Sequence, residues 1–153
     1  MIEFLDLPDP PYFLDIESIK LKKNDWPGNK EIYGLYDCEN ELIDFLKSLF
    51  PKCTSFRYQL LRDGIPKHVD VDRVMCYNYI LQSGGVNVET VWWDNDKEIY
   101  RTRIPEKKWH KINVTTEHSI ENIETERVAI SVFKNDPSVG YYVDYSDEVI
   151  TKE

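Results

Sequence analysis

The sequence predicts a mainly β fold with one or two helices, an antiparallel sandwich or jelly-roll barrel. Roughly seven or eight short runs of alternating or aromatic-rich residues follow one another after the first third of the chain, separated by turn signals. Only one convincing helical pattern precedes them, and many short strands behind a single helix are typical of such barrels. Aromatic residues make up 13% of the chain, a composition suited to sheet surfaces.

The helical pattern covers residues 39–50, where apolar side chains recur every three or four residues and form one stripe. Asp37 or Asn40 is expected to cap the start of this helix, and Pro51 is expected to end it. The apolar stripe consists of Leu42, Ile43, Phe45, Leu46, Leu49 and Phe50.

The predicted strands lie between turns rich in Gly, Asp, Asn, Ser and Pro, at residues 63–66, 82–85 and 94–96. Residues 1–36 are expected to be irregular, to supply an edge strand and to cover the core. The tail, 146–153, is expected to be flexible. The strands themselves are expected at 56–61, 74–81, 86–92, 98–103, 111–115, 128–133 and 140–145.

Length and composition limit the classes of function. A chain of 153 residues is expected to form a single domain, 1–153, without a separate substrate domain. Its 19 basic and 28 acidic residues give a net charge of −9, which argues against a nucleic-acid partner because phosphate binding relies on Lys and Arg. No apolar run approaches the roughly 20 residues of a membrane span, and the acidic, Pro-containing N-terminus does not resemble a signal peptide.

The cysteines are expected to be free thiols. Cys38, Cys53 and Cys76 are odd in number and show no close paired spacing, so the sequence predicts neither a disulfide framework nor a zinc site. A reducing, cytoplasmic location is the expectation that follows.

The candidate functional residues begin with the triplet His68-Val69-Asp70. Residues i and i+2 of an extended strand point to the same face, so the first and third members can bind one ion together. A third ligand must come from elsewhere, and His118 lies in a polar stretch between two apolar runs, where a loop or strand end can present it. Two imidazoles and one carboxylate form the facial triad that holds non-haem Fe(II) with open positions. Arg127 follows nine residues later and opens an apolar, strand-like run.

Each of these residues also has a simpler interpretation. A His-x-Asp triplet near a turn often forms only hydrogen bonds, Arg127 can be a surface residue, and Tyr58 can be a core aromatic. His110 is a rival distal ligand, but it stands among Lys and Trp residues without a basic partner at the right separation, so we expect an exposed loop position. Asp72 is a rival carboxylate, one step too far for the tight pair. Two of the three histidines fall on the motif, which favours the metal site.

Together these residues resemble the Fe(II)/2-oxoglutarate-dependent oxygenase superfamily, particularly its small phage and bacterial members and the motif spacing of prolyl hydroxylases. The resemblance covers roughly residues 58–133, about half of the chain. It follows the family's order of His68-x-Asp70, a Gly-containing turn, His118, and then Arg127 before an apolar strand. The resemblance implies a double-stranded β-helix, the jelly-roll barrel also found in cupins.

The resemblance also implies roles for individual residues. It assigns the metal-binding and catalytic roles to His68, Asp70 and His118. It assigns binding of the cosubstrate 2-oxoglutarate to Arg127 and Tyr58. Ser131 lies on the same strand face as Arg127 and is expected to add a hydroxyl group to this cosubstrate site. A planar guanidinium suits a carboxylate, and Tyr58 stands ten residues before His68, like a tyrosine that helps bind 2-oxoglutarate in prolyl hydroxylases. Many family members carry a hydroxyl two residues after the Arg. This chain has Ala129 at that place, and the hydroxyl on the same strand face comes two residues later, at Ser131.

The implied activity is that of a dioxygenase, an oxidoreductase that hydroxylates its substrate and releases succinate and CO2. The implied cofactors are Fe(II) and 2-oxoglutarate, with ascorbate as a supplementary one. The substrate would be a protein side chain, a peptide or a small metabolite. Two alternatives remain open: a non-catalytic cupin-like module that binds a metal or ligand, and a structural or assembly protein whose aromatic sheet face is an interface.

Overall fold

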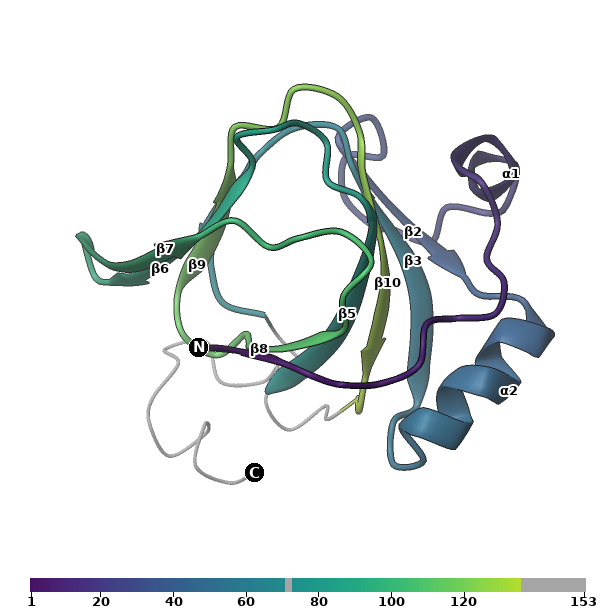
Figure 1. Cartoon of the computed structure of the whole chain (residues 1–153). Coiled ribbons are helices and arrows are strands. Elements are labelled where there is room, and N and C mark those ends of the chain that lie inside the picture. Colours follow the sequence, from purple (N-terminus) through teal and green to yellow (C-terminus); the bar gives the residue numbers. More distant parts are fainter. Residues whose placement is uncertain (71–72, 136–153) are drawn as a thin grey trace.

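The computed structural model describes residues 1–70 and 73–135, and within these ranges the chain forms ten strands and two helices. The strands make two antiparallel sheets that face each other and enclose the barrel seen end-on in Figure 1. This architecture confirms the predicted mainly β jelly-roll fold. The strand expected at 140–145 and the tail 146–153 lie outside the described residues.

The two sheets draw their neighbouring strands mostly from distant parts of the sequence. The larger sheet has the order β1-β8-β5-β10-β3-β2, with strands Ile2–Phe4, His110–Asn113, Met75–Gln82, Arg127–Phe133, Ser55–Leu61 and Tyr33–Asp37. The smaller sheet has the order β4-β9-β6-β7, with strands Ile65–His68, His118–Glu121, Glu89–Asp94 and Lys97–Thr102. Residues 1–36 thus hold β1, one of the helices and the start of β2, and both strands are edges of the larger sheet.

The predicted helix is present as α2, Asn40–Leu49, and lies against the outer face of the larger sheet (Figure 1). Neither expected cap is used, because the cap position is Glu39, whose side chain makes no capping bond. Its carboxylate instead accepts hydrogen bonds from Tyr58 and Tyr12 at 2.7 and 3.0 Å and contacts Lys22 Nζ at 3.1 Å. The helix therefore starts where a long-range polar cluster holds Glu39.

A second helix, α1, Ile16–Lys20, belongs to the N-terminal cover. Asp15 caps it by accepting a hydrogen bond from the backbone N–H of Ser18 at 2.8 Å, and Ile19 is fully buried beneath it. Neither helix among the described residues has the length and apolar character needed to cross a membrane.

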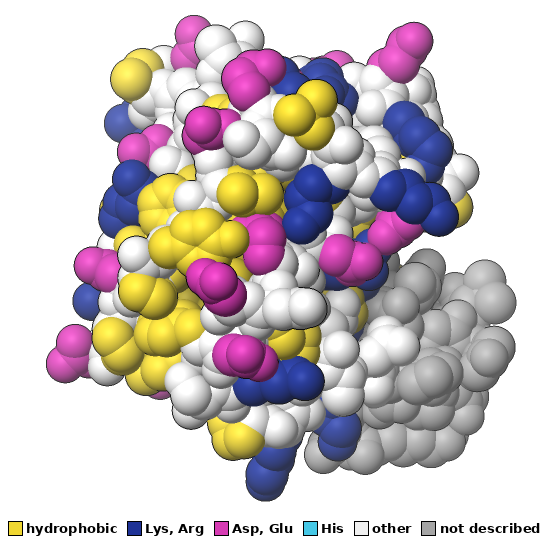
Figure 2. Space-filling model, turned by 90° about the vertical axis from the view of Figure 1, so that its right-hand side faces the viewer, with side chains coloured by type: hydrophobic (Ala, Val, Ile, Leu, Met, Phe, Trp, Pro, Cys, Tyr) yellow, Lys and Arg dark blue, Asp and Glu magenta, His cyan; other side chains and the backbone are white. Residues whose placement is uncertain are grey.

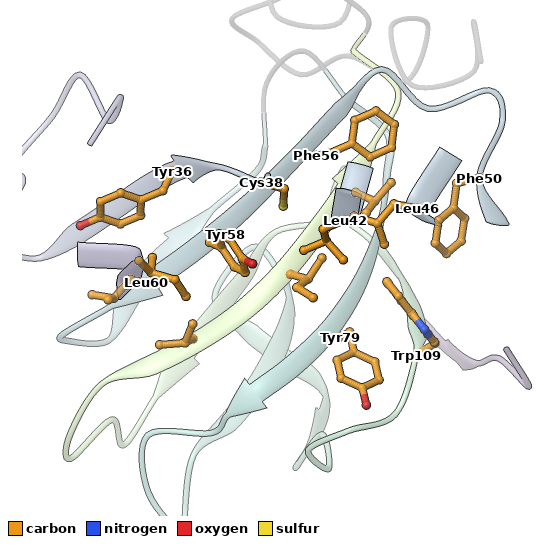
Figure 3. Packing of buried hydrophobic residues seen from close by; sticks show 14 residues of the cluster. Tyr36, Cys38, Leu42, Leu46, Phe50, Phe56, Tyr58, Leu60, Tyr79 and Trp109 are labelled. Atoms are coloured by element: carbon orange, nitrogen blue, oxygen red, sulfur yellow. The ribbon is translucent and has the colours of Figure 1, made fainter. Parts of the chain in front are cut away.

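The main apolar core lies outside the barrel, between the larger sheet and the helices (Figure 3). Leu42 and Leu46 of α2 meet side chains from the outer face of the sheet, among them Tyr58 and Ile130. Strand β10 is buried along its whole length, so one set of its side chains enters this core while the alternate set faces the barrel interior. The interior is thereby free to hold polar groups.

The outer surface over the helices is mixed in character. Figure 2 shows hydrophobic side chains gathered in a patch on this face, with acidic and basic side chains interspersed around it.

Leu46→Ala is expected to lower the free energy of unfolding by about 2 to 5 kcal/mol, because Leu46 is completely buried between α2 and the sheet. Urea denaturation followed by circular dichroism measures this change. Asp44→Ala on the exposed side of the same helix is the control and should change stability by less than about 0.5 kcal/mol. Equal effects of the two substitutions would contradict the described packing.

Candidate metal centre and adjoining cavity

The sheet pairing brings the two motif histidines together. His68 ends β4 and His118 begins β9, and the two residues are direct partners in the antiparallel register. Their ring centroids are 4.4 Å apart. Asp70 follows two residues after His68, and its backbone N–H donates a hydrogen bond to the carbonyl oxygen of Val114 at 2.9 Å. Residues 50 positions apart in the chain thus form one cluster.

The side-chain atoms of this cluster converge on one point. Asp70 Oδ1 lies 3.2 Å from Nε2 of His68 and 3.3 Å from Nε2 of His118. One donor atom from each residue lies within 4.8 Å of the others, a spacing at which the three can hold one metal ion. His68, Asp70 and His118 therefore form a compact two-nitrogen, one-oxygen donor set.

The backbone sets which nitrogen of each ring is available. Nδ1 of His68 lies 2.8 Å from the carbonyl oxygen of Pro66, and Nδ1 of His118 lies 2.8 Å from that of Thr116. A carbonyl oxygen only accepts, so each Nδ1 carries a hydrogen and each Nε2 is the nitrogen that faces Asp70. Nε2 donates to the carboxylate while it is protonated and becomes a metal ligand when it loses that proton. A carbonyl bonded to the other ring nitrogen is the usual support of a metal-binding histidine.

Burial and hydrogen bonding determine the charge of the cluster. Burial raises the pKa of Asp70, but the hydrogen bonds from His118 and His68 outweigh it and hold this pKa well below its usual range. Burial lowers the pKa of His68, yet the hydrogen bonds to Asp70 and the Pro66 carbonyl leave it raised. The carboxylate is thus ionised, the form that binds a cation, and the donor set suits a divalent first-row transition metal.

Arg127 supplies a buried positive charge in the same interior. It is the first residue of β10, is only 8% exposed, and lines an inner cavity of about 60 Å3 together with His68, Asp70 and His118. It makes no ion pair with any residue of the described part of the chain, and burial alone lowers its pKa to about 10. A buried charge without a partner is strongly unfavourable, so the cavity is suited to an anion.

A glycine turn holds the backbone of Arg127. Gly84 has φ +91°, and a Cβ at this position would lie 3.1 Å from Arg127 Cβ and N. The carbonyl oxygen of Gly84 accepts hydrogen bonds from the N–H groups of Glu124 and Thr125, both at 2.9 Å. Only glycine suits this conformation and this approach, so the predicted Gly-containing turn positions the start of β10.

Ser131 and Tyr58, the other two predicted cosubstrate residues, point to opposite sides of the sheet. Ser131 faces the inner cavity, as does Arg127 four residues earlier on the same strand. Tyr58 is paired with Ile130 and lies in the outer core, where its hydroxyl donates to Glu39 and accepts from the N–H of Leu14 at 3.0 Å. The structure does not bring Tyr58 to the cavity, because the period of two in β3 directs it outward.

Another tyrosine reaches the site from the neighbouring edge strand. Gln59, not Tyr58, is the residue of β3 that faces the cavity, and its Nε2 donates a hydrogen bond to the hydroxyl of Tyr33 at 2.5 Å. Tyr33 belongs to β2, and burial raises its pKa to about 12. Neither residue stood out in the sequence, because no local pattern indicates that β2 pairs with β3.

Arg73 is a further site residue without a sequence signal. Its guanidinium lies 3.5 Å from the ring centroid of Phe133, and Nη1 lies 3.9 Å from Asp70 Oδ2. The rival carboxylate Asp72 lies outside the described residues.

His110 is not an exposed loop residue, which corrects the expectation from the sequence. It begins β8, is completely buried, and lines the inner cavity. Its pairing with Asn78 of β5 and Phe4 of β1 turns the ring inward. Burial first, and then the charge of Arg127, lower its pKa to about 4. The sequence did contain one indication of a half-buried strand here, because His110 and Ile112 alternate with the polar residues Lys111 and Asn113.

A larger pocket of about 460 Å3 adjoins the metal cluster on its other side. It shares five lining residues with the inner cavity, namely Gln59, Ile65, His68, Asp70 and Arg73. Its remaining wall is mostly apolar and includes Trp26 and Tyr33, whose ring centroids are 4.4 Å apart. The metal cluster therefore lies between an inner cavity with a basic group and an outer pocket with an aromatic wall.

Comparisons with known proteins show the fold. No family model matches this chain, and no curated protein matches it. A 2OG-Fe(II) oxygenase family oxidoreductase from Burkholderia pseudomallei is similar in structure, with a TM-score of 0.57 and 10% identity over 82% of this chain and 77% of that chain. A prolyl hydroxylase from Trichoplax adhaerens, in complex with a hypoxia inducible factor peptide fragment, has a TM-score of 0.54 and 12% identity over 79% and 66%.

Oxalate decarboxylase from Bacillus subtilis, which has Mn(II) centres, is also similar, with a TM-score of 0.50 and 13% identity. The match covers 77% of this chain but only 29% of that chain. The barrel is thus shared with oxygenases and with a decarboxylase, so the fold alone does not assign the reaction.

The buried His110 is expected to make the protein sensitive to acid. Its pKa is about 4 in the folded state and about 6.5 in the unfolded chain, so between these pH values the unfolded chain binds more protons than the folded protein. The stability of the folded state therefore falls as the pH falls from about 6.5 to about 4. Between about pH 7 and about pH 5 the metal-free wild type should lose about 2 kcal/mol more stability than His110→Gln. Urea denaturation at both pH values measures the difference, and identical pH dependence would contradict it.

Proposed function

We propose that this chain is an Fe(II)- and 2-oxoglutarate-dependent dioxygenase that hydroxylates its substrate and releases succinate and CO2. The observation that carries the proposal is the presence, in one cavity, of the His68, Asp70 and His118 cluster and of the buried guanidinium of Arg127, which pairs with none of the described residues. The first can hold a metal and the second an anion. The likeness of the fold to a 2OG-Fe(II) oxygenase family protein is consistent with this pairing.

His68 and His118 would hold Fe(II) through Nε2 and Asp70 through a carboxylate oxygen. Bound Fe(II) supplies the redox chemistry that uses O2 to convert a 2-oxo acid to its decarboxylated product while the substrate is hydroxylated. The protein's own part is orientation. The carbonyl oxygens of Pro66 and Thr116 fix both rings, and the low pKa of Asp70 keeps an anionic ligand available.

Arg127 and Ser131 would bind the carboxylate of 2-oxoglutarate that is remote from the metal. A guanidinium and a carboxylate form two parallel charge-assisted hydrogen bonds, which are stronger in a buried site than in water. Binding the anion would also remove the unfavourable energy of the buried, unpaired charge. Tyr58 is left out of this proposal, since its hydroxyl is already bonded to Glu39 and Leu14.

The outer pocket would hold the substrate. Its apolar and aromatic wall next to His68 and Asp70 favours a small molecule or a peptide side chain that presents an apolar group to the metal. A prolyl hydroxylase of similar fold has a peptide partner, which is consistent with this choice. We also propose a cytoplasmic location, since Cys38, Cys53 and Cys76 are all free thiols. We further propose a single domain, since the strands of the described residues form the two sheets of one barrel.

A non-catalytic cupin-like module that binds a metal ion is the second candidate. The donor set of His68, Asp70 and His118 fits it equally well, because holding an ion requires nothing more. Arg127 separates the two functions. A barrel that holds only an ion gains nothing from a buried guanidinium that pairs with no described residue, whereas a dicarboxylate cosubstrate would bind to such a group.

His118→Ala is expected to reduce affinity for Fe(II) or Mn(II) by more than about 100-fold, because it removes one of three direct ligands, and even supporting residues change metal affinity by about 10- to 100-fold. Anaerobic titration of the chelator-treated protein with Mn(II), followed by electron paramagnetic resonance, measures the affinity. Asp96→Asn is the matched control, since this carboxylate is fully exposed and its partner among the described residues is Lys67. Unchanged metal affinity of the His118 variant would rule out the site.

Arg127→Gln is expected to weaken binding of 2-oxoglutarate to the Mn(II)-loaded protein by about 10- to 100-fold, because charge-assisted hydrogen bonds contribute about 1.5 to 3 kcal/mol. Isothermal calorimetry measures this change while metal affinity stays constant. Arg103→Gln is the control, because Arg103 is exposed and donates its hydrogen bond to Asn87. If wild type and the Arg127 variant bind 2-oxoglutarate alike, the second candidate function is favoured.

A further inference from the structure

Two buried acceptor atoms of the inner cavity have no hydrogen-bond partner in the described part of the chain. They are Nε2 of His110 and Oδ1 of Asn78, which are paired residues on the neighbouring strands β8 and β5. Ser131 of β10 is paired with Asn78, so the three polar side chains form one row across three strands. A buried polar atom without a partner is destabilising by about 1 to 3 kcal/mol, so this row indicates a ligand.

The ring of His110 is held in one orientation. Its Nδ1 lies 3.2 Å from the carbonyl oxygen of Lys108, which can only accept, so Nδ1 carries the hydrogen. Nε2 of the neutral ring therefore presents a lone pair to the cavity. A lone pair facing an anion is repulsive, whereas a protonated Nε2 would donate a hydrogen bond to it.

We infer that His110 takes up a proton when an anionic cosubstrate binds beside Arg127, so that loading of the dicarboxylate is coupled to protonation of this residue. The inference rests on the proposed function and adds a cosubstrate-binding residue to it. In the bound state, the imidazolium of His110 and the guanidinium of Arg127 would face one carboxylate. Asn78 can turn its amide and donate from Nδ2, so it needs no proton.

The electrostatics of the cavity support the coupling. Without a ligand, burial and the charge of Arg127 keep His110 neutral, with a pKa of about 4. A carboxylate on Arg127 cancels the charge that lowers this pKa and adds a negative charge that raises it. Ligand binding therefore moves the pKa of His110 toward the neutral range, and a raised pKa in the complex means proton uptake on binding.

The other titratable and charged groups facing this cavity do not compete with His110 in the neutral range. Among the described residues they are Arg127 from β10, Cys76 from β5, Arg73, and the cluster of His68, Asp70 and His118. Burial raises the pKa of Cys76 to about 12, and Arg127, with a pKa of about 10, stays charged in the neutral range. Metal binding keeps the cluster deprotonated, so the experiment uses metal-loaded protein.

The test is calorimetry of the full-length Mn(II)-loaded protein titrated with 2-oxoglutarate in PIPES, ACES and HEPES, whose ionisation enthalpies differ. The slope of binding enthalpy against ionisation enthalpy gives the protons taken up. We expect uptake to rise toward about one proton as the pH falls from about 8 to about 6, with affinity increasing by up to about tenfold per pH unit. His110→Gln, which is polar but does not titrate, should show no uptake and a flat pH dependence.

Wild-type binding without proton uptake, or equal uptake in His110→Gln, would overturn the inference while leaving the proposed function intact. Absence of any 2-oxoglutarate binding would overturn both. Should the Gln variant not fold, His110→Asn replaces it, because Asn keeps a donor near the Nδ1 position. A second, independent test is nitrogen-15 NMR of the Zn(II)-loaded wild type. The pKa of His110, the one histidine outside the metal cluster, should rise when 2-oxoglutarate is added. An unchanged pKa would contradict the coupling.

Discussion

The antiparallel pairing of β4 with β9 is the constraint on which the candidate site depends. This register makes His68 and His118 direct partners, and the extended backbone after β4 brings Asp70 to the same point. A shift of one residue in the register between β4 and β9 would turn one of the two histidines to the opposite face of the sheet, and the three ligand atoms would no longer lie close together. The carbonyl oxygens that orient both rings come from residues two positions earlier in each segment, so one pairing also sets the ring orientations.

Placement of the main core outside the barrel is the second requirement. The helix α2 and the N-terminal segment cover the outer face of the larger sheet, and Leu42, Leu46 and Tyr58 provide apolar burial there. The inner face of the same strands can then carry Arg127 and His110, which would be unfavourable in a barrel that depended on its interior for stability. Stability and chemistry are thus divided between the two faces of one sheet, most clearly along β10.

Local patterns in the sequence predicted those features that a few neighbouring residues determine. The apolar stripe of the helix, the two-residue spacing of His68 and Asp70, and the glycine turn before Arg127 each depend on short segments. The position of Tyr58 was not predictable in this way, because it depends on which face of β3 the helix covers. His110 was misjudged for a related reason. Its charged sequence neighbours suggested a loop, whereas pairing with β5 and β1, from distant segments, buries it.

The central claim is that one cavity holds a metal at His68, Asp70 and His118 and a dicarboxylate at Arg127 at the same time. Anaerobic absorption spectroscopy of the purified protein tests it most directly, because a 2-oxo acid chelated to Fe(II) gives a weak charge-transfer band in the visible range that neither component gives alone. We predict that this band appears only when both Fe(II) and 2-oxoglutarate are added. Its absence with both present, together with no heat of binding, would contradict the account.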